Sequence, residues 1–539
     1  MKNKITSIII ASVVCLFSCS DDFLQRDSLT QLSQGSFWAN EEDAVNGVNA
    51  IYNSYRTLMY NWCLYGFLDD FSDISSQTRA MTMTQGTYPA YGAFISLPWR
   101  TLYGGIYRAN TALQQIPGIE MKDEKLKARL IGEATFLRAF YYFKLWDLYG
   151  GVPIYDEPMA PGDAYKARNS VDDVYRFIEK DLTDAISMLP ESYSGNDIGR
   201  ATKWAAVALR GKAKLYTQQW SEAAADFKDV IDNSDRDLHP VYSQIFNYKW
   251  EIVEGKANKE IIYDVQFIME VGAGNQCDKI WGNRHANSAG WQQSAPAPAL
   301  VNEYETIDGQ PFSWSNYTNA QGEPFDPDNE ADWSDEASVR KIFEDRDPRL
   351  HQTVIVPWSE FIGKDNNKFI FKWPTTTESD CYTPQFTATY GWRKFVHEGN
   401  ENTLPYHSPN NIPVIRFADV LLMYAEAQNE ASGPDQSVYN AINRVRSRVD
   451  MPPVPEGTKD EIRERIRHER KVEFPGEGIW YSDIRRWKIG IELCNHTIKG
   501  FVGNTQRERA FREREYLWGI PSTDIELNPD LEQNPGWNN

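Results

Sequence analysis

Apolar side chains recur every three or four positions through the first part of the chain, which is the spacing of one face of a helix. The clearest run contains Leu126, Leu130, Ala134, Leu137, Tyr141, Leu145 and Leu148. Gly150-Gly151-Val152-Pro153 follows this run, and a glycine cap with a proline beyond it typically ends a helix. We therefore predict a long helix from about Leu126 that stops at Gly150.

Three further helices are predicted from their start and stop signals. Ser170 stands three residues before Asp173, a capping arrangement, and the apolar face that follows ends at Pro190. Thr202 begins the next helix, and Trp220 begins the one after it.

The last two of these helices, over residues 205–231, predict one hairpin of the tetratricopeptide type. Small alanines allow the two helices to approach closely, and bulky aromatic residues fill the gaps. No strict repeat is visible across the block. We predict a repeat-like, mainly helical N-terminal region over residues 37–248.

The remainder, residues 249–539, reads as a second region in two parts. Residues 249–411 are rich in Gly, Pro, Asn, Asp and Trp, with one strand expected over 261–267. Residues 412–539 return to helical periodicity, with helices expected over 415–430, 438–449 and 459–474 and a loop-like tail from Trp518. The predicted fold class is mainly α, a tetratricopeptide-like scaffold of helical hairpins with a loop-rich insertion carrying a few short strands.

The first residues have the pattern of a signal peptide. Lys2 and Lys4 precede an apolar run over residues 8–14, which is too short for a spanning helix of about 20 residues. Ser18-Cys19 ends the run and resembles a bacterial lipobox, which implies cleavage of residues 1–18 and lipid attachment to Cys19. About two acyl chains are enough for stable anchoring to a bilayer.

Residues 19–36 are then expected to form a lipidated tether. Ser20 resembles an outer-membrane sorting signal, and Asp21-Asp22 resembles a surface-export signal of Bacteroidetes-type bacteria. An ordinary secretory signal with an incidental cysteine is the alternative. The leader therefore implies an outer-membrane, lipid-anchored protein exposed at the cell surface.

Composition narrows the class of partner. The formal charge of −20 argues against nucleic acid and against docking on anionic lipid. Cys63, Cys277, Cys381 and Cys494 are far apart and make no metal-binding or disulfide pattern. Aromatic residues reach 13% of the chain, and many of them fall in polar, loop-like stretches.

Motifs for catalysis or metal binding are missing from the sequence. The histidines make no HExxH spacing, and no GxSxG, phosphate loop or GxGxxG occurs, so no catalytic residue and no cofactor are expected. One acidic stretch offers oxygen ligands suited to calcium but lacks the glycine and final glutamate of an EF-hand loop. A solvated loop is its preferred interpretation; its residues are Asp326, Asp328, Glu330, Asp332 and Asp335.

Several charged residues lie within apolar runs, where paired charges usually hold elements in register. We interpret them as scaffold ion pairs: Glu133 and Arg138; Arg346, Asp347 and Arg349; and Asp483, Arg485 and Arg486.

Several motifs in order resemble the SusD/RagB family of outer-membrane nutrient-binding lipoproteins. They are Cys19-Ser20-Asp21-Asp22-Phe23-Leu24, residues 132–143 with 149–153, residues 346–350, residues 415–427, residues 483–487 and Asn534-Pro535-Gly536. The resemblance covers nearly the whole mature chain. It implies a helical scaffold, no catalysis, and a SusC-like TonB-dependent barrel transporter that the lipoprotein covers like a lid. It also implies a glycan ligand or, in some members, a peptide.

Two polar stretches carry the aromatic residues that a glycan site needs. A sugar presents a flat apolar face ringed by hydroxyls, which an aromatic ring buries and polar neighbours hydrogen-bond. The candidate ligand-binding residues are Asp70, Arg79, Tyr88 and Tyr91 in residues 69–99, and Trp281, Asn283, Arg284, Trp291 and Trp314 in residues 281–314. Packing within the loops and contact with the transporter are alternative roles for each aromatic residue. Trp99 is expected to be structural.

The sequence thus predicts a surface lipoprotein that captures glycan and delivers it to a barrel transporter. The alternatives are a peptide-binding member of the same family, a purely structural tetratricopeptide adaptor, and a helical glycoside hydrolase. The hydrolase needs two carboxylates about 5–10 Å apart in a cleft.

Overall fold

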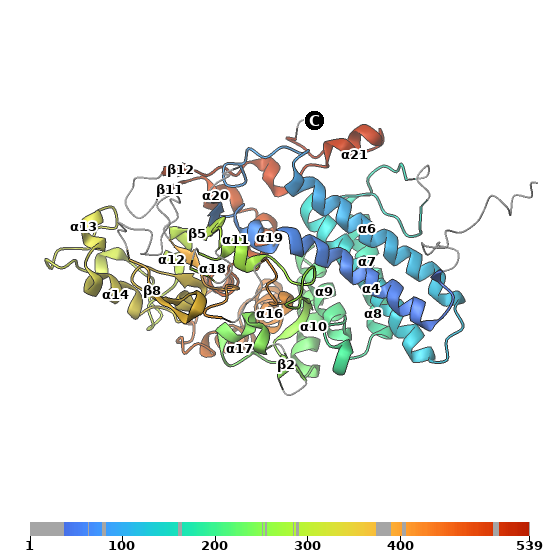
Figure 1. Cartoon of the computed structure of the whole chain (residues 1–539), viewed down its shortest axis with the longest axis horizontal. Helices are drawn as coiled ribbons and strands as arrows, with labels where there is room; N and C mark the ends of the chain where they lie inside the picture. Colours follow the sequence, from blue (N-terminus) through green and yellow to red (C-terminus); the bar gives the residue numbers. More distant parts are fainter. Residues whose placement is uncertain are drawn as a thin grey trace, which may run out of the picture.

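The computed structural model describes residues 37–537, except 63, 78–81, 160–163, 251, 254–255, 284, 287–289, 373–389, 401–405 and 500–505. The leader, Cys19 and the tether lie outside the described residues. Figure 1 shows an elongated molecule with long N-terminal helices at one end and a loop-rich part with short helices and strands at the other.

The N-terminal region consists of helices packed against their neighbours in sequence. They are α4 (Glu41–Trp62), α5 (Leu64–Asp69), α6 (Ala93–Gln115), α7 (Glu124–Tyr149), α8 (Val171–Met188), α9 (Lys203–Tyr216) and α10 (Trp220–Asn233). Helix α6 packs on α7, α7 on α8, α8 on α9 and α9 on α10, with α4 covering α6. This arrangement confirms the predicted mainly α scaffold of helical hairpins.

The start and stop signals act as predicted. The Ser170 hydroxyl accepts the Asp173 N–H at 3.1 Å, and the Thr202 hydroxyl accepts the Ala205 N–H at 3.2 Å. Helix α7 ends at Gly150, whose φ of 77° is a conformation that favours glycine. In the α9–α10 hairpin, a Cβ at Gly211 would lie 2.8 Å from the Phe227 ring, so a small residue is required for the close approach.

In the second region, residues 249–411 carry short helices, and residues 412–539 carry the longer helices α16 to α18 together with further short ones. They are α11 (Cys277–Trp281), α12 (Pro298–Glu303), α13 (Glu330–Trp333), α14 (Glu336–Glu344), α15 (Arg349–Thr353), α16 (Phe417–Ser432), α17 (Gln436–Ser447), α18 (Lys459–Glu473), α19 (Ile479–Arg486), α20 (Gly490–Cys494) and α21 (Ser522–Leu527). Helix α16 packs on both α10 and α18, which joins the two regions through one core.

All strands of the described residues pair two by two and antiparallel. The pairs are β1 (Ser75–Gln77) with β5 (Ser294–Pro296), β4 (Ile261–Val265) with β10 (Ile412–Arg416), β2 (Ile252–Val253) with β3 (Lys256–Ala257), β6 (Val354–Ile355) with β9 (Gly391–Trp392), β7 (Glu360–Ile362) with β8 (Lys368–Ile370), and β11 (Thr497–Lys499) with β12 (Gln506–Glu508).

Two boundaries differ from the prediction. The helix expected from Ile415 begins at Phe417, because Ile415 and Arg416 pair with β4 and are held extended. The tail expected as loop contains the short helix α21, which starts directly after Pro521.

Glu133 and Arg138 form scaffold ion pairs as predicted, but each pairs with other residues and not with the other. Glu133 pairs with Arg129 and Arg200, whereas Arg138 pairs with Asp181 at 2.7 Å. The helix that carries both residues is thus tied to α8 and to the segment before α9.

Arg485 and Arg486 of α19 behave as predicted. Arg486 pairs with Glu426 and Asp483, and Arg485 pairs with Asp147 of α7.

Arg346 corrects the prediction for the group of Arg346, Asp347 and Arg349, because its guanidinium forms no ion pair with any carboxylate of the described residues. It donates to the carbonyls of Tyr304 and Val301 and lies 3.6 Å from the centre of the Phe312 ring. Its neighbour Arg349 does form the predicted pair with Asp347, at 2.7 Å.

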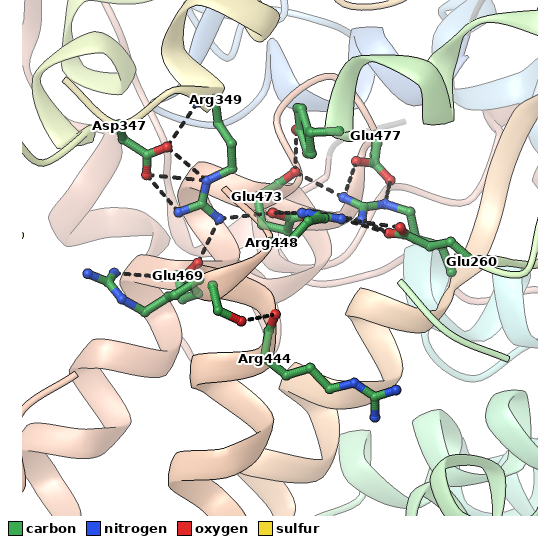
Figure 2. A network of polar contacts seen from close by, with 12 residues as sticks. Glu260, Asp347, Arg349, Arg444, Arg448, Glu469, Glu473 and Glu477 are labelled. Atoms are coloured by element: carbon green, nitrogen blue, oxygen red, sulfur yellow. Dashed lines mark hydrogen bonds and ion pairs between the residues drawn. The ribbon is translucent and has the colours of Figure 1, made fainter. Parts of the chain in front are cut away.

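Arg349 belongs to a buried network of opposite charges that we call the core ion network. Figure 2 shows its guanidinium between Asp347, Glu469 and Glu473. Glu473 also accepts from Arg416 at 2.7 Å and from Arg448 at 2.5 Å. Its contacts therefore connect β10, α15, α18 and Arg448, the residue that follows α17.

A second carboxylate extends the core ion network toward the loop-rich part. Glu477 pairs with Arg416 at 2.8 Å and with Lys394 at 2.7 Å, and all three side chains are buried. Burial lowers the pKa of Lys394 to about 8, against the opposing effect of Glu477. The network therefore also fixes the segment that contains Phe395.

Replacing Glu473 with Gln tests the core ion network. Removing one partner of a buried pair leaves the others uncompensated and typically costs about 3–5 kcal/mol, so we expect a loss of that order in the free energy of unfolding. Denaturant unfolding measures it. Asp232→Asn, which breaks a half-exposed pair with Lys228, is the matched control and should cost about 0.5 kcal/mol or less. Equal effects of the two substitutions would contradict the assigned role.

The same carboxylate predicts acid sensitivity. Burial by itself would raise the pKa of Glu473, but the surrounding guanidinium groups outweigh it and hold the pKa well below its ordinary value of 4.5. A lowered pKa contributes stability above the unfolded value that is lost as the pH falls. We expect the wild type to lose more stability than Glu473→Gln between pH 5 and 3, roughly, in unfolding curves.

Candidate functional site

The two predicted ligand-binding stretches lie side by side because β1 pairs with β5. Ser76 stands opposite Ala295, and Gln77 stands opposite Ser294. Asp70 strengthens this junction, since its Oδ1 accepts hydrogen bonds from the hydroxyls of Ser75 at 2.6 Å and Ser294 at 2.8 Å. The structure thus brings residues 69–99 and 281–314 together.

Two further aspartates bind the first stretch to α18, to α19 and to the turn between these helices. Asp73 pairs with Lys471 at 2.8 Å and accepts the indole N–H of Trp480 at 2.7 Å. Asp69 accepts the backbone N–H of Gly476 at 2.7 Å. These residues are buried, so their role is to hold the stretch in place rather than to contact a ligand.

A closed loop after α11 positions Trp291. The N–H of Trp291 donates to the Lys279 carbonyl at 2.6 Å, and that of Gln293 donates to the Ile280 carbonyl at 2.7 Å. Gly290 lies so close to the other end of the loop that a Cβ there would be 1.8 Å from the Gly282 oxygen. The chain therefore returns along α11 and places Trp291 beside Lys279.

Tyr406 comes to the same place from a distant part of the sequence. Two residues beyond it, Ser408 exchanges backbone hydrogen bonds of 2.7 and 2.8 Å with Asn275, which lies two residues before the start of α11. Tyr406 has a φ of 69°, so its backbone is held in the left-handed region.

The candidate site consists of Trp291, Tyr406 and Lys279, and we call it the aromatic pair with its lysine. The two ring centres lie 5.9 Å apart at an angle of 70°. The Lys279 ammonium lies 4.9 Å from the Trp291 ring and 4.7 Å from the Tyr406 ring, within cation–π range. Trp291 is 38% exposed and Tyr406 is 40% exposed. The cation fixes both rings while part of each still faces solvent.

Beneath the pair, Trp281 is buried instead of exposed. Its ring packs on Trp392 and Phe395, with centres 6.0 and 5.7 Å away. Because Trp281 ends α11, this packing anchors the helix that carries Lys279. The expectation that Trp281 contacts a ligand is corrected: it supports the site from the core.

Three other predicted contact residues are also buried and are corrected in the same way. Asp70 joins the two stretches as described above. The side-chain oxygen of Asn283 accepts hydrogen bonds from the backbone N–H groups of His285 and Ala286, two residues of the segment between α11 and Trp291. Tyr88 packs between Phe71 and Trp537.

The other candidates stay predictions. Tyr91 is 69% exposed just before α6. Trp314 is half-buried and stacks on Phe325, with ring centres 5.6 Å apart. Arg79 and Arg284 lie outside the described residues.

Sequence reasoning missed Tyr406 and Lys279. Tyr406 stands in the polar stretch Leu404-Pro405-Tyr406-His407-Ser408-Pro409, so the criterion of an aromatic residue in a loop could have found it. Nothing local in the sequence marks Lys279, because its role arises from two rings that only the fold brings to it.

Comparison with known proteins identifies the family to which this fold belongs. A model of the SusD family matches residues 259–537, and one described as "Starch-binding associating with outer membrane" matches residues 22–216. The first covers more than half of the chain, so the protein belongs to the SusD family, as the sequence motifs indicated.

Relatives and solved structures agree along nearly the full length. A SusD-like protein of Formosa agariphila is 26% identical over 99% of both chains. A SusD-like carbohydrate-binding protein of Bacteroides fragilis is 28% identical, with a TM-score of 0.78 over 92% of this chain and 100% of that one. A structure titled as a laminarin-binding SusD-like protein, 24% identical, matches the fold with a TM-score of 0.70 over 93% of this chain and 100% of that one.

Some of these similar proteins are described as carbohydrate-binding, and this similarity supports glycan binding as the general class of function. Within the part of the chain that the structure describes, every helix is too short or too polar to span a bilayer.

Replacing Asp70 with Asn tests the buried junction of the two stretches. Burial raises the pKa of Asp70 to about 7 from 3.8, although the bonds from Ser75 and Ser294 oppose the shift. A raised pKa contributes stability that is present below the unfolded value and lost as the pH rises through the folded value. Between pH 4 and 7.5, roughly, we expect the wild type to lose more stability than Asp70→Asn, as measured by the unfolding temperature. Parallel curves for the two proteins would contradict this account.

Proposed function

We propose that this protein is a cell-surface, lipid-anchored lipoprotein of the outer membrane that binds glycan and delivers it to a SusC-like TonB-dependent transporter. The observation that carries the proposal is the exposed aromatic pair with its lysine, in a chain of the SusD family. No step of chemistry is involved: the protein captures and releases its ligand unchanged.

The aromatic pair has the properties that a sugar ring requires. Two rings at a steep angle can cover an apolar sugar face and its edge, and the ammonium between them keeps both in place before the ligand arrives. Such pre-organisation avoids the entropy cost of ordering side chains on binding. The backbone hydrogen bonds from Trp291 and Gln293 to α11 extend this rigidity to the backbone that carries Trp291.

The expected affinity is modest, because the ligand must leave toward the transporter. The leader supports the proposed location, since a lipidated Cys19 followed by a tether would hold the folded body at the membrane. A peptide ligand, the alternative within the family, would make its affinity depend on hydrogen bonds to backbone groups.

The double variant Trp291→Ala/Tyr406→Ala tests the proposed site. Losing about 60 Å² of apolar contact costs about 1.5 kcal/mol, so we expect binding to weaken by about tenfold or more. Isothermal calorimetry with laminarihexaose and maltohexaose measures the change.

Trp250→Ala is the matched control for this experiment. Trp250 is 39% exposed, close to the exposure of Trp291, and lies two residues before β2. In Figure 1, β2 stands at the lower edge of the molecule, whereas α11 lies near its centre. Its affinity should equal that of the wild type. If the double variant retained both the wild-type affinity and the wild-type number of bound oligosaccharides, the aromatic pair would not be a binding site.

The anchor is tested by Cys19→Ala. Without the lipid acceptor we expect the protein to move from the membrane fraction to the soluble fraction in cell fractionation. Cys15→Ala, which removes the other cysteine of the leader, should leave it in the membrane fraction. A Cys19→Ala protein that stayed in the membrane fraction would refute lipid anchoring at this residue.

A further inference from the structure

A second aromatic-walled hollow lies on the helical part of the molecule. It has a volume of about 360 Å³, within the range of small-molecule sites, and lies between α6, the described residues 153–159 and 164–165, and α21. Trp99, Tyr103 and Tyr107 line it from α6, and Tyr155 and Tyr165 line it from the facing segment. We call this hollow the α6–α21 groove.

The groove is separate from the aromatic pair. Its walls come from α6 and α21, whereas the pair is built on α11 and the strand region that follows. Figure 1 shows α6 and α21 well to the right of α11 and β5. A ligand in one place therefore leaves the other open.

Hydrogen bonds across its edges hold the groove open in one shape. The Tyr103 hydroxyl donates to the Pro153 carbonyl at 2.9 Å, and the Asn110 side chain donates to the Tyr155 carbonyl at 2.8 Å. At the other edge the Trp99 indole N–H donates to the Asp524 carboxylate at 3.1 Å, which ties α6 to α21. Trp99 is buried, as expected for a structural residue, and forms part of the floor.

Exposed rings stand above this fixed floor. Tyr107 is 41% exposed and Tyr165 is 53% exposed, from opposite walls. Exposed rings above a floor that hydrogen bonds hold in one shape offer flat apolar surface to a ligand.

Charged groups of both signs line the same hollow. Arg100 and Glu157 are exposed, and Asp524 is half-buried beside Trp99. A guanidinium only donates hydrogen bonds and an ionised carboxylate only accepts them, whereas a sugar hydroxyl does both. Neighbouring hydroxyls can therefore satisfy both groups, while an apolar helix laid in the groove would leave them without partners.

We propose that the α6–α21 groove is a second binding site for a short stretch of a neutral glycan. An acidic glycan is disfavoured because two carboxylates line the groove and the chain carries a formal charge of −20. The inference extends the proposed function and depends on it only for the class of ligand. Two sites on one rigid body raise the retention of a long glycan, because binding at the second becomes intramolecular.

The number of oligosaccharides bound at saturation tests this proposal. The full chain, Tyr107→Ala/Tyr165→Ala, Trp291→Ala/Tyr406→Ala and the control Trp250→Ala are each titrated with laminarihexaose and with maltohexaose in a calorimeter. We expect the groove variant to bind half as many oligosaccharides as the wild type, with its unfolding temperature unchanged. The aromatic-pair variant should keep only the groove site.

The outcomes separate the two proposals. If the groove variant binds as many oligosaccharides as the wild type, the second site is refuted and the aromatic pair stands. If only the groove variant loses binding, the groove is the glycan site and the aromatic pair is not. If the wild type binds neither probe at millimolar concentration, the second site is refuted together with the ligand class on which it rests.

Discussion

Glu473 and Arg416 lie at the centre of the charges on which the rest of the structure depends. Both side chains are fully buried, and each contacts partners from several elements. Buried charges are costly unless they are paired and hydrogen-bonded, so each element of the core ion network needs the others in place. The network therefore ties the loop-rich part, through Asp347, Arg349 and Lys394, to β10 and α18 (Figure 2).

A short series of contacts connects the core ion network to the candidate site and fixes the position of the site. Lys394 pairs with Glu477, and its neighbour Phe395 packs on Trp281 at the end of α11. Helix α11 in turn carries Lys279, whose ammonium holds Trp291 and Tyr406. Buried charges thus determine where the exposed rings of the candidate site stand.

The helical frame could be predicted from the sequence because its signals are local. Periodicity, the Ser170 and Thr202 caps and the stop at Gly150 act within a few residues. The site could be predicted only by region. Whether Trp281 or Trp291 faces solvent depends on Trp392, Phe395 and Tyr406, which are about a hundred residues away in sequence and reach them only in the fold. The start of α16 was misplaced for the same reason, since β4 holds Arg416 extended.

The measurement that tests this account most directly is the structure of the protein with a bound laminarin or starch oligosaccharide. We expect a sugar ring lying against Trp291 and Tyr406, with Lys279 still between the two rings and the hydrogen bond from the Trp291 N–H to the Lys279 carbonyl kept. A sugar bound elsewhere while the aromatic pair stayed bare, or a pair that forms only after this hydrogen bond breaks, would contradict the proposed site.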